Sequence, residues 1–378
     1  MRNGEGLYDP DAIGAGRVLG LIRDRDETTR AELVRETGLS RSTLAKRVQD
    51  LLALGLVREV DGHASTGGRP PAAIVFNQRA GFVLAADVGH ARTRVAVCDL
   101  AGAPRAERVV PAGIDEAPEA LLGLVADRFR ELLATARVDP AAVRGIGVGL
   151  APGWDDFSVR DWLAARFEVP TLVETVVNTM ALGEHRTHWR EVEHLLFVEI
   201  GRTIGAGIVS GRRIHRGAQG IAGDIGHVRL PDHPDVVCRC GNTGCLEAVA
   251  GGDAVAAGLR AHGVAAASAE DVVALVHAGE PLALQAVRRA GRDLGSVLAQ
   301  CINFYNPGAI VIGGAMADAH RQLLMGVREV AFARSLPMAT RDLRMCRSRL
   351  GDRAGLIGAA IMVADHLLAP STVDALVR

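Results

Sequence analysis

The sequence predicts an α/β protein with a winged helix-turn-helix at its N-terminus. The first 77 residues carry the order helix, helix, glycine-containing turn, helix and hairpin, which is typical of that DNA-binding motif. From Gly81 onward, apolar runs of strand length alternate with segments of helical spacing, which indicates an α/β domain. At 378 residues, 48% of them apolar, the chain is long enough for two or three domains.

The N-terminal helices are predicted from apolar spacing and from capping residues. Residues 16–23 place Val18, Leu19 and Ile22 on one face. Thr28 or Thr29 caps a second helix, and residues 36–40 form the turn. Ser40 caps a third helix that ends at Gly55. Its apolar residues recur at helical spacing and are Leu44, Val48, Leu51 and Leu52.

The hairpin and the α/β region follow from apolar runs bounded by turn residues. Residues 56–60 and 74–76 are the two expected wing strands, joined through a Gly- and Pro-rich loop. The α/β strands are expected at 82–88, 94–100, 143–150, 171–173, 195–200, 206–209 and 309–312. The α/β helices are expected at 121–133, 178–190, 253–260, 269–278, 282–304 and 354–368.

The third helix carries the candidate DNA contacts. Its side chains can donate to base edges and phosphates in the major groove, and an arginine at the tip of the wing could enter the minor groove. We expect contacts from Ser40, Arg41, Ser42, Thr43, Lys46, Arg47 and Arg69. Two alternatives stay open: a charged, solvated helix face, and a helix-turn-helix that binds only protein.

A second cluster has the composition of a metal site. His227 precedes three closely spaced cysteines, Cys238, Cys240 and Cys245, and three thiolates with one imidazole match a tetrahedral Zn²⁺ site. Because four protein ligands close the coordination sphere, the ion would be structural. Gly241 and Gly244 would let the short loop fold around it. The alternative is three core cysteines and a surface histidine.

Bulk composition narrows the classes of function. The net charge is −1, so DNA binding must come from a local basic patch, and the 3% aromatic content argues against a stacking platform for single strands. Because we find neither a long apolar run nor a signal-peptide pattern, we expect no membrane partner and a cytoplasmic location.

The sequence resembles the ROK family of repressors and sugar kinases along nearly its whole length. The most specific similarities are 223–227 (GDIGH) and 238–247 (CRCGNTGCLE), and Gly67-Gly68-Arg69-Pro70 is similar to the wing of the repressors. The resemblance implies a two-lobed actin/hexokinase-like (ribonuclease H-like) domain. We therefore expect a DNA-binding domain at 1–77, a first lobe at 78–195 and a second lobe at 196–378, whose last helix is a candidate to return to the first lobe.

Where the resemblance implies kinase machinery, this sequence departs from it. The catalytic Asp of the kinases falls at Val176, which cannot accept a proton, and Thr175 replaces a sugar-binding Asn. The two phosphate loops align with 87–91 (DVGHA) and 201–205 (GRTIG), and each has lost part of the pattern. We therefore expect that the protein is not an enzyme.

Part of a sugar site remains. The resemblance implies that Asp224, His227 and Glu247 contact sugar hydroxyls, although the carboxylates could instead only orient the zinc ligands. The leading hypothesis is a regulator, a repressor by its resemblance, that binds a double-stranded operator as a homodimer or homotetramer and responds to a sugar or sugar phosphate. The alternatives are a ligand-independent regulator whose lobes only oligomerise, and an ATP-dependent sugar kinase.

Overall fold

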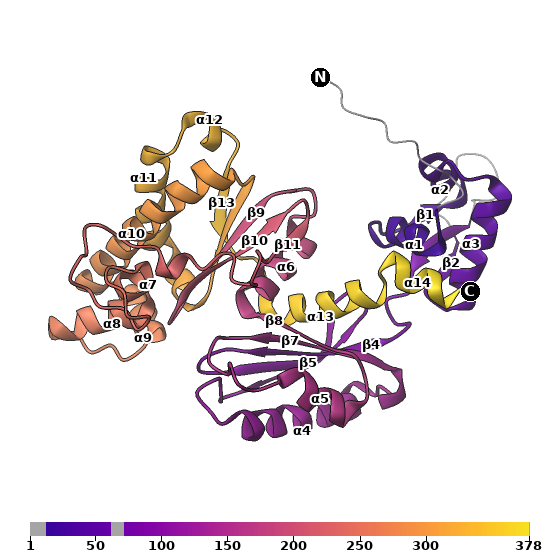
Figure 1. The fold of residues 1–378 in the computed structure, drawn as a ribbon, viewed down its shortest axis with the longest axis horizontal. Helices are drawn as coiled ribbons and strands as arrows, with labels where there is room; N and C mark the ends of the chain where they lie inside the picture. Colours follow the sequence, from indigo (N-terminus) through magenta and orange to yellow (C-terminus); the bar gives the residue numbers. More distant parts are fainter. Residues whose placement is uncertain (1–12, 62–71, 378) are drawn as a thin grey trace.

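The structure is a computed structural model that describes residues 13–61 and 72–377. The tip of the expected wing, including Arg69, lies outside the described residues. The fold has three parts: a small N-terminal head and two α/β lobes (Figure 1).

The head is a three-helix unit with a small antiparallel sheet. Its sheet has the strand order β1-β3-β2. The helices are α1 (Ala15–Arg23), α2 (Arg30–Thr37) and α3 (Arg41–Ala53), and the strands are β1 (Thr28–Thr29), β2 (Val57–Val60) and β3 (Ala73–Phe76). The strand β1 was not predicted, because two threonines before a helix carry no strand pattern.

Local sequence explains where the head helices begin. Thr29 caps α2 in a capping box: its side chain accepts from the Glu32 amide, and the Glu32 carboxylate accepts from the Thr29 amide at 2.8 Å. The Ser40 hydroxyl caps α3 by accepting from the Thr43 amide at 3.1 Å. Leu44, Val48 and Leu51 are buried, so α3 turns its polar face outward as the spacing predicted.

The first lobe is a five-stranded sheet of order β6-β5-β4-β7-β8. The first three strands along the chain are antiparallel, and β7 and β8 add in parallel to β4. Its strands are β4 (Phe82–Val88), β5 (Thr93–Asp99), β6 (Pro104–Val110), β7 (Val143–Leu150) and β8 (Thr171–Thr175). Its helices are α4 (Pro118–Ala136) and α5 (Val159–Phe167), with a 3-10 turn at Pro140–Ala142.

The second lobe repeats this topology, in the order β11-β10-β9-β12-β13. The strands are β9 (Leu195–Ile200), β10 (Ile204–Ser210), β11 (Arg213–His215), β12 (Ala309–Gly313) and β13 (Arg344–Arg347). The helices are α7 (Leu246–Ala250), α8 (Gly252–Ala261), α9 (Ala269–His277), α10 (Pro281–Tyr305), α11 (His320–Arg334) and α12 (Pro337–Thr340). The helix α6 (Val176–His188) follows β8 of the first lobe and, among the strands, packs mainly against β9 and β10 of the second lobe. Short 3-10 turns span Ile225–His227, Ala315–Ala319 and Gly351–Arg353.

The last two helices connect all three parts of the chain. The helix α13 (Ala354–Leu367) packs against α6, β7 and β4, and α14 (Pro370–Leu376) packs against α1 of the head (Figure 1). The Asp374 carboxylate accepts from the Gly16 amide at 2.8 Å. One apolar core therefore runs from the head through α13 to the first-lobe sheet.

The helices α6 and α13 cross at glycines. A Cβ at Gly358 would lie 1.7 Å from the Thr179 carbonyl oxygen, and one at Gly183 would lie 2.3 Å from the Ala354 oxygen. The two backbones can therefore approach only because both positions lack a side chain. This contact fixes α13 against α6.

No single helix within 13–61 and 72–377 has both the length and the apolarity to cross a membrane. One bent pair of segments, Gly351–Leu367 with Pro370–Leu376, meets that test by length and composition alone.

Candidate ligand cleft, metal cluster and DNA-binding helix

A cleft of about 1060 Å³ lies between the two lobes. The first lobe contributes the end of β4 and the loop to β5, and the second lobe contributes the β9–β10 turn and the loop before α7. Cavities of this size hold small organic ligands. The cleft also collects the residues that the sequence singled out for sugar and phosphate binding.

Two carboxylates with raised pKa values face this cleft. Asp87 is only 8% exposed, and burial raises its pKa to about 7, with Arg94 opposing the rise. Burial also raises the pKa of Glu199 to about 7, and the nearby Asp87 carboxylate adds to the rise. The two groups come from opposite lobes, and both carry a proton more readily than ordinary carboxyl groups.

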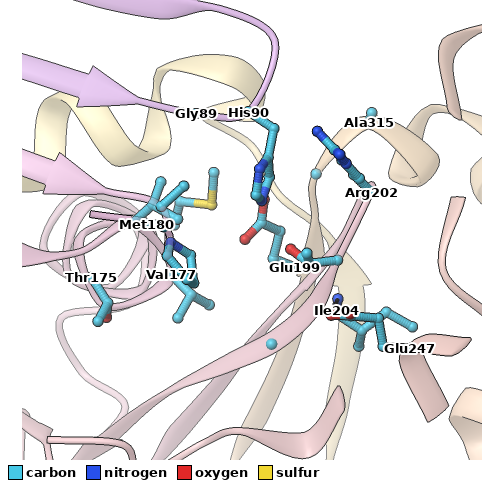
Figure 2. Close-up of a pocket in the computed structure, with 18 of the residues that line it drawn as sticks. Gly89, His90, Thr175, Val177, Met180, Glu199, Arg202, Ile204, Glu247 and Ala315 are labelled. Carbon is cyan, nitrogen blue, oxygen red and sulfur yellow. Dashed lines mark hydrogen bonds between the residues drawn. The ribbon is translucent and has the colours of Figure 1, made fainter. Parts of the chain in front are cut away.

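Arg202 forms ion pairs with both sides of the cleft. Its guanidinium lies 2.7 Å from Asp115 of the first lobe and 3.2 Å from Asp253 of the second. Figure 2 shows His90, from the β4–β5 loop, and Arg202, from the β9–β10 turn, pointing toward the same space above Glu199. Burial lowers the pKa of His90, so its ring is neutral near pH 7.

The position of the expected kinase base holds an alkyl side chain. Val176 begins α6, is 7% exposed and lines the cleft beside Thr175. Glu174, two residues earlier, is committed to Arg216 at 2.6 Å and to the Asn178 amide at 3.0 Å.

The three sugar-binding candidates line the second-lobe side of the cleft. The Glu247 carboxylate accepts from Arg239 at 2.8 Å and from the Ile204 amide at 3.4 Å. Asp224 directly precedes the 3-10 turn Ile225–His227, and His227 is its last residue. Asp224, His227 and Glu247 thus line the same cleft, and His227 is also one of the candidate metal ligands.

His227, Cys238, Cys240 and Cys245 form one cluster, with their ligand atoms all within 4.8 Å of one another. The Cys240 and Cys245 sulfurs are 3.7 Å apart, and Nδ1 of His227 is 3.6 Å from the Cys238 sulfur. A tetrahedral Zn²⁺ with ordinary bond lengths separates two thiolates by about 3.8 Å and a thiolate from an imidazole nitrogen by about 3.6 Å. The residues present therefore fit a zinc ion.

The expected DNA contacts lie on the outer face of α3. Arg41, Ser42 and Lys46 are exposed, whereas Thr43 and Arg47 are half-buried. The Ser40 hydroxyl is occupied by its cap and by the hydroxyls of Ser42 and Thr43, at 2.9 and 2.8 Å. The Ser40 hydroxyl therefore serves mainly as the N-cap of α3. Arg69 is not among the described residues.

The sequence did not predict a role for Glu199 or Asp365, nor the ion pairs that Arg202 makes across the cleft. Glu199 and Arg202 stand at the β9–β10 turn, where the sequence shows only the loss of the phosphate-loop pattern. Asp365, on α13, pairs with Arg23 of the head and with Arg186 of α6. No local pattern signals the ion pairs of Arg202 with Asp115 or of Asp365 with Arg23 and Arg186, since the partners lie more than 80 residues apart in the chain.

Two family models match the chain. The ROK family model matches residues 83–366, and the MarR family model matches residues 11–64. The first covers both lobes and the second covers the head as far as the wing.

Regulators are similar to the chain over almost its full length. The xylose repressor of Bacillus subtilis is 27% identical over 371 residues, covering 93% of this chain and 94% of the relative. The DNA-binding transcriptional dual regulator NagC of Escherichia coli is 28% identical over 381 residues, covering 94% and 93%. A crystal structure of a ROK family transcriptional regulator, described as a homologue of the E. coli MLC protein, is 26% identical with a TM-score of 0.82, covering 97% and 98%.

Kinases are similar to the lobes without the head. A ROK hexokinase from Thermus thermophilus is 29% identical with a TM-score of 0.60, and it covers 74% of this chain and 97% of its own. The part left uncovered corresponds in size to the head and its connections.

Proposed function

The chain belongs to the ROK family, and from this premise we propose that it is a transcriptional repressor whose head binds an operator and whose two lobes sense a sugar. The observation that carries the proposal is that one chain combines two features. Its helix α3 exposes hydrogen-bond donors, and its interlobe cleft has Val176 at the position of the kinase base. Full-length similarity to proteins named as a xylose repressor and as a transcriptional dual regulator supports a function in transcription control.

The operator contacts are assigned to the exposed face of α3. Arg41, Ser42 and Lys46 present donors to a major groove, and Arg47 and Thr43 lie at the border of that face. One head contacts few base pairs, so we propose that two copies bind a palindromic site as a homodimer, or as a pair of dimers. Such a regulator acts where the chromosome is, in the bacterial cytoplasm.

The sugar is assigned to the interlobe cleft, against Asp224, His227 and Glu247. Carboxylates and imidazoles pair well with hydroxyl groups, and all three line the same wall. Similar proteins are named as a xylose repressor and, in Escherichia coli O157:H7 and other strains, as an N-acetylglucosamine repressor, which agrees with a sugar as effector.

We propose that the cleft no longer transfers phosphate. Val176 offers no oxygen to a sugar hydroxyl, and Glu174 is held by Arg216. Arg202 places a paired guanidinium in the second phosphate loop. The lobes therefore act in binding rather than in catalysis.

Zn²⁺ is proposed as a structural ion held by His227, Cys238, Cys240 and Cys245. Bound there, it would supply a cross-link for a loop that has little regular structure of its own. The same loop carries Asp224 toward the cleft and ends at α7, which holds Glu247. The ion would thus keep the sugar-binding wall in shape.

A route from cleft to head runs along α6 and α13. The helix α6 begins at the cleft with Val176 and ends near Arg186, which pairs with Asp365 at 2.6 Å. Asp365 also pairs with Arg23 of α1 at 3.1 Å. A change in lobe angle that moves α6 would therefore move the attachment of the head. A ligand can drive this change only by binding one lobe arrangement better than the other.

The test is capture of genomic DNA fragments by the purified protein, with and without a panel of sugars. Enrichment of palindromic fragments that one sugar releases supports the proposal. Enrichment that no sugar changes favours the alternative of a ligand-independent regulator. Steady turnover of ATP with any sugar in the panel would revive the kinase alternative.

A further inference from the structure

Among the described charged side chains that line the cleft, the arginines are held in ion pairs, whereas some of the carboxylates are not. Among the described residues that line it, nine are acidic and four are arginines. Each of the four arginines already has a carboxylate partner: Arg92 and Arg94 pair with Asp352, Arg202 with Asp115 and Asp253, and Arg239 with Glu247. The described lining of the cleft therefore offers a ligand no free guanidinium.

The unpaired set is acidic and lies at the centre of the cleft. The Asp87 side chain is more than nine-tenths buried, and its Oδ1 has no hydrogen-bond partner within the described chain. Glu199 lies on the opposite lobe, and the charge of the cleft-facing Asp87 carboxylate contributes to raising its pKa. Buried acceptors of this kind are costly unless a donor reaches them.

The backbone holds both carboxylates in place. A Cβ at Gly355, at the start of α13, would lie 2.6 Å from Oδ1 of Asp87, and a Cβ at Gly314, after β12, would lie 3.0 Å from Cγ of Glu199. Gly314 has a φ of +85°, which favours glycine. Both side chains therefore sit against glycine backbone, and both line the cleft.

His90 adds a donor and an acceptor to the same place. Neither ring nitrogen has a partner among the residues described, and the neutral ring can donate from one nitrogen and accept at the other. Figure 2 shows the ring between Gly89 and Glu199, directed into the cavity. A polyol, whose hydroxyls both donate and accept, complements two carboxylates and one imidazole.

We propose, building on the function above, that Asp87, His90 and Glu199 form a subsite for an uncharged, hydroxyl-bearing ligand such as a free sugar or glycoside, and that it rejects phosphorylated ligands. A phosphate placed here meets two carboxylates and must break an existing ion pair to gain a guanidinium. A ligand hydroxyl donating to Asp87 and another donating to Glu199 join the two lobes. The subsite thereby favours the closed arrangement of the cleft.

The test compares matched pairs of probes by calorimetry with the full-length, zinc-loaded protein at pH 8, above the raised pKa values of both carboxyl groups. The pairs are glucose with glucose 6-phosphate, and N-acetylglucosamine with N-acetylglucosamine 6-phosphate, together with xylose, cellobiose, inorganic phosphate and Mg²⁺ alone. We expect at least one uncharged sugar to bind, and any phosphorylated counterpart to bind at least about tenfold more weakly.

Variants locate the binding. Glu199→Gln should weaken sugar binding by about tenfold or more, because the variant loses a hydrogen bond to a charged group. Asp87→Asn should act in the same direction. Glu119→Gln, on the exposed first turn of α4, should have no effect. Thermal unfolding of each variant checks that it folds.

The outcomes separate this inference from the proposed function. A phosphorylated sugar that binds more tightly than its uncharged partner would overturn the inference and leave a sugar-responsive regulator intact. Stabilisation by Mg²⁺ alone, lost in Glu199→Gln, would mean a cation site and would also overturn it. Binding of no sugar at all would overturn both the inference and the sensing function.

Discussion

The carboxylate of Asp365, on α13, lies 3.1 Å from the guanidinium of Arg23 in the head. The same carboxylate holds Arg186 of α6 at 2.6 Å. One side chain therefore connects the DNA-binding head to the helix that begins at the cleft. It is the clearest direct link between the two proposed activities of the chain.

Replacing this carboxylate should uncouple the two activities. In Asp365→Ala we expect operator binding and sugar binding to remain, while the sugar-induced loss of DNA affinity falls by about fivefold or more. The partly exposed ion pairs contribute only about 1 kcal/mol of stability, so the variant should stay folded. The measurement is operator affinity by fluorescence anisotropy with and without the sugar.

A matched control is Glu36→Ala, which removes an ion pair with Arg25 on the outside of the head. It should leave the sugar response unchanged. A wild-type response in Asp365→Ala would remove this residue from the coupling route.

The DNA-binding face can be tested through the single lysine of the chain, Lys46, which is exposed on α3. Operator DNA should protect it from an amine-reactive label, as measured by mass spectrometry, because a phosphate or base edge covers the ammonium group. Labelling that is unchanged at saturating operator would place the DNA elsewhere.

Arg41→Ala should weaken operator binding by about tenfold and reduce its salt dependence, since one cation fewer reaches the DNA. The control is Arg108→Ala, on the exposed edge strand β6 of the first lobe. Equal affinities of the two variants would contradict the assignment of α3 as the recognition helix.

The metal cluster predicts a coupled loss of zinc and stability. Cys240→Ser should lower the bound zinc, measured by elemental analysis, and lower the melting temperature by about 5 °C or more. Cys301→Ser, half-buried on α10 and not part of the cluster, should keep the zinc. A wild-type protein that is purified without metal and is equally stable with a chelator present would exclude a structural ion.

The buried Asp87 predicts a specific dependence of stability on pH. Its folded pKa is raised from 3.8 to about 7, so its contribution is fully present below pH 3.8 and is lost as the pH rises through about 7. The stability that Asp87→Asn gains relative to wild type should therefore grow between about pH 3.8 and pH 7 and level off above, as measured by urea unfolding. A difference that stays constant over this range would show that the ionisation of Asp87 does not change across it.

Much of the fold could be predicted where apolar spacing was strong. The buried strands β4, β7 and β9 were predicted with the bounds that the structure has. The missed elements include edge strands and short helices, but also the helix α5 and the 15-residue helix α11. The strand β6 alternates charged and small residues at an exposed sheet edge, and β13 is likewise an edge strand. The helix α14 is defined by its packing on α1, which no local pattern encodes.

The site was predictable to the extent that it is local in sequence. The candidate metal ligands fall within 19 residues and carry their own spacing, so the cluster could be proposed from the sequence alone. The subsite of Asp87, His90 and Glu199 could not, because it exists only where two lobes meet. The same holds for Asp365, whose two partners lie 342 and 179 residues away.

The most direct test of a sugar-responsive, DNA-binding regulator is capture of genomic DNA by the purified protein, followed by competition with uncharged sugars and their phosphates. We predict enrichment of palindromic fragments that depend on Arg41 and are released by one uncharged sugar. Failure to enrich any fragment, with the protein folded and loaded with zinc, would contradict this function.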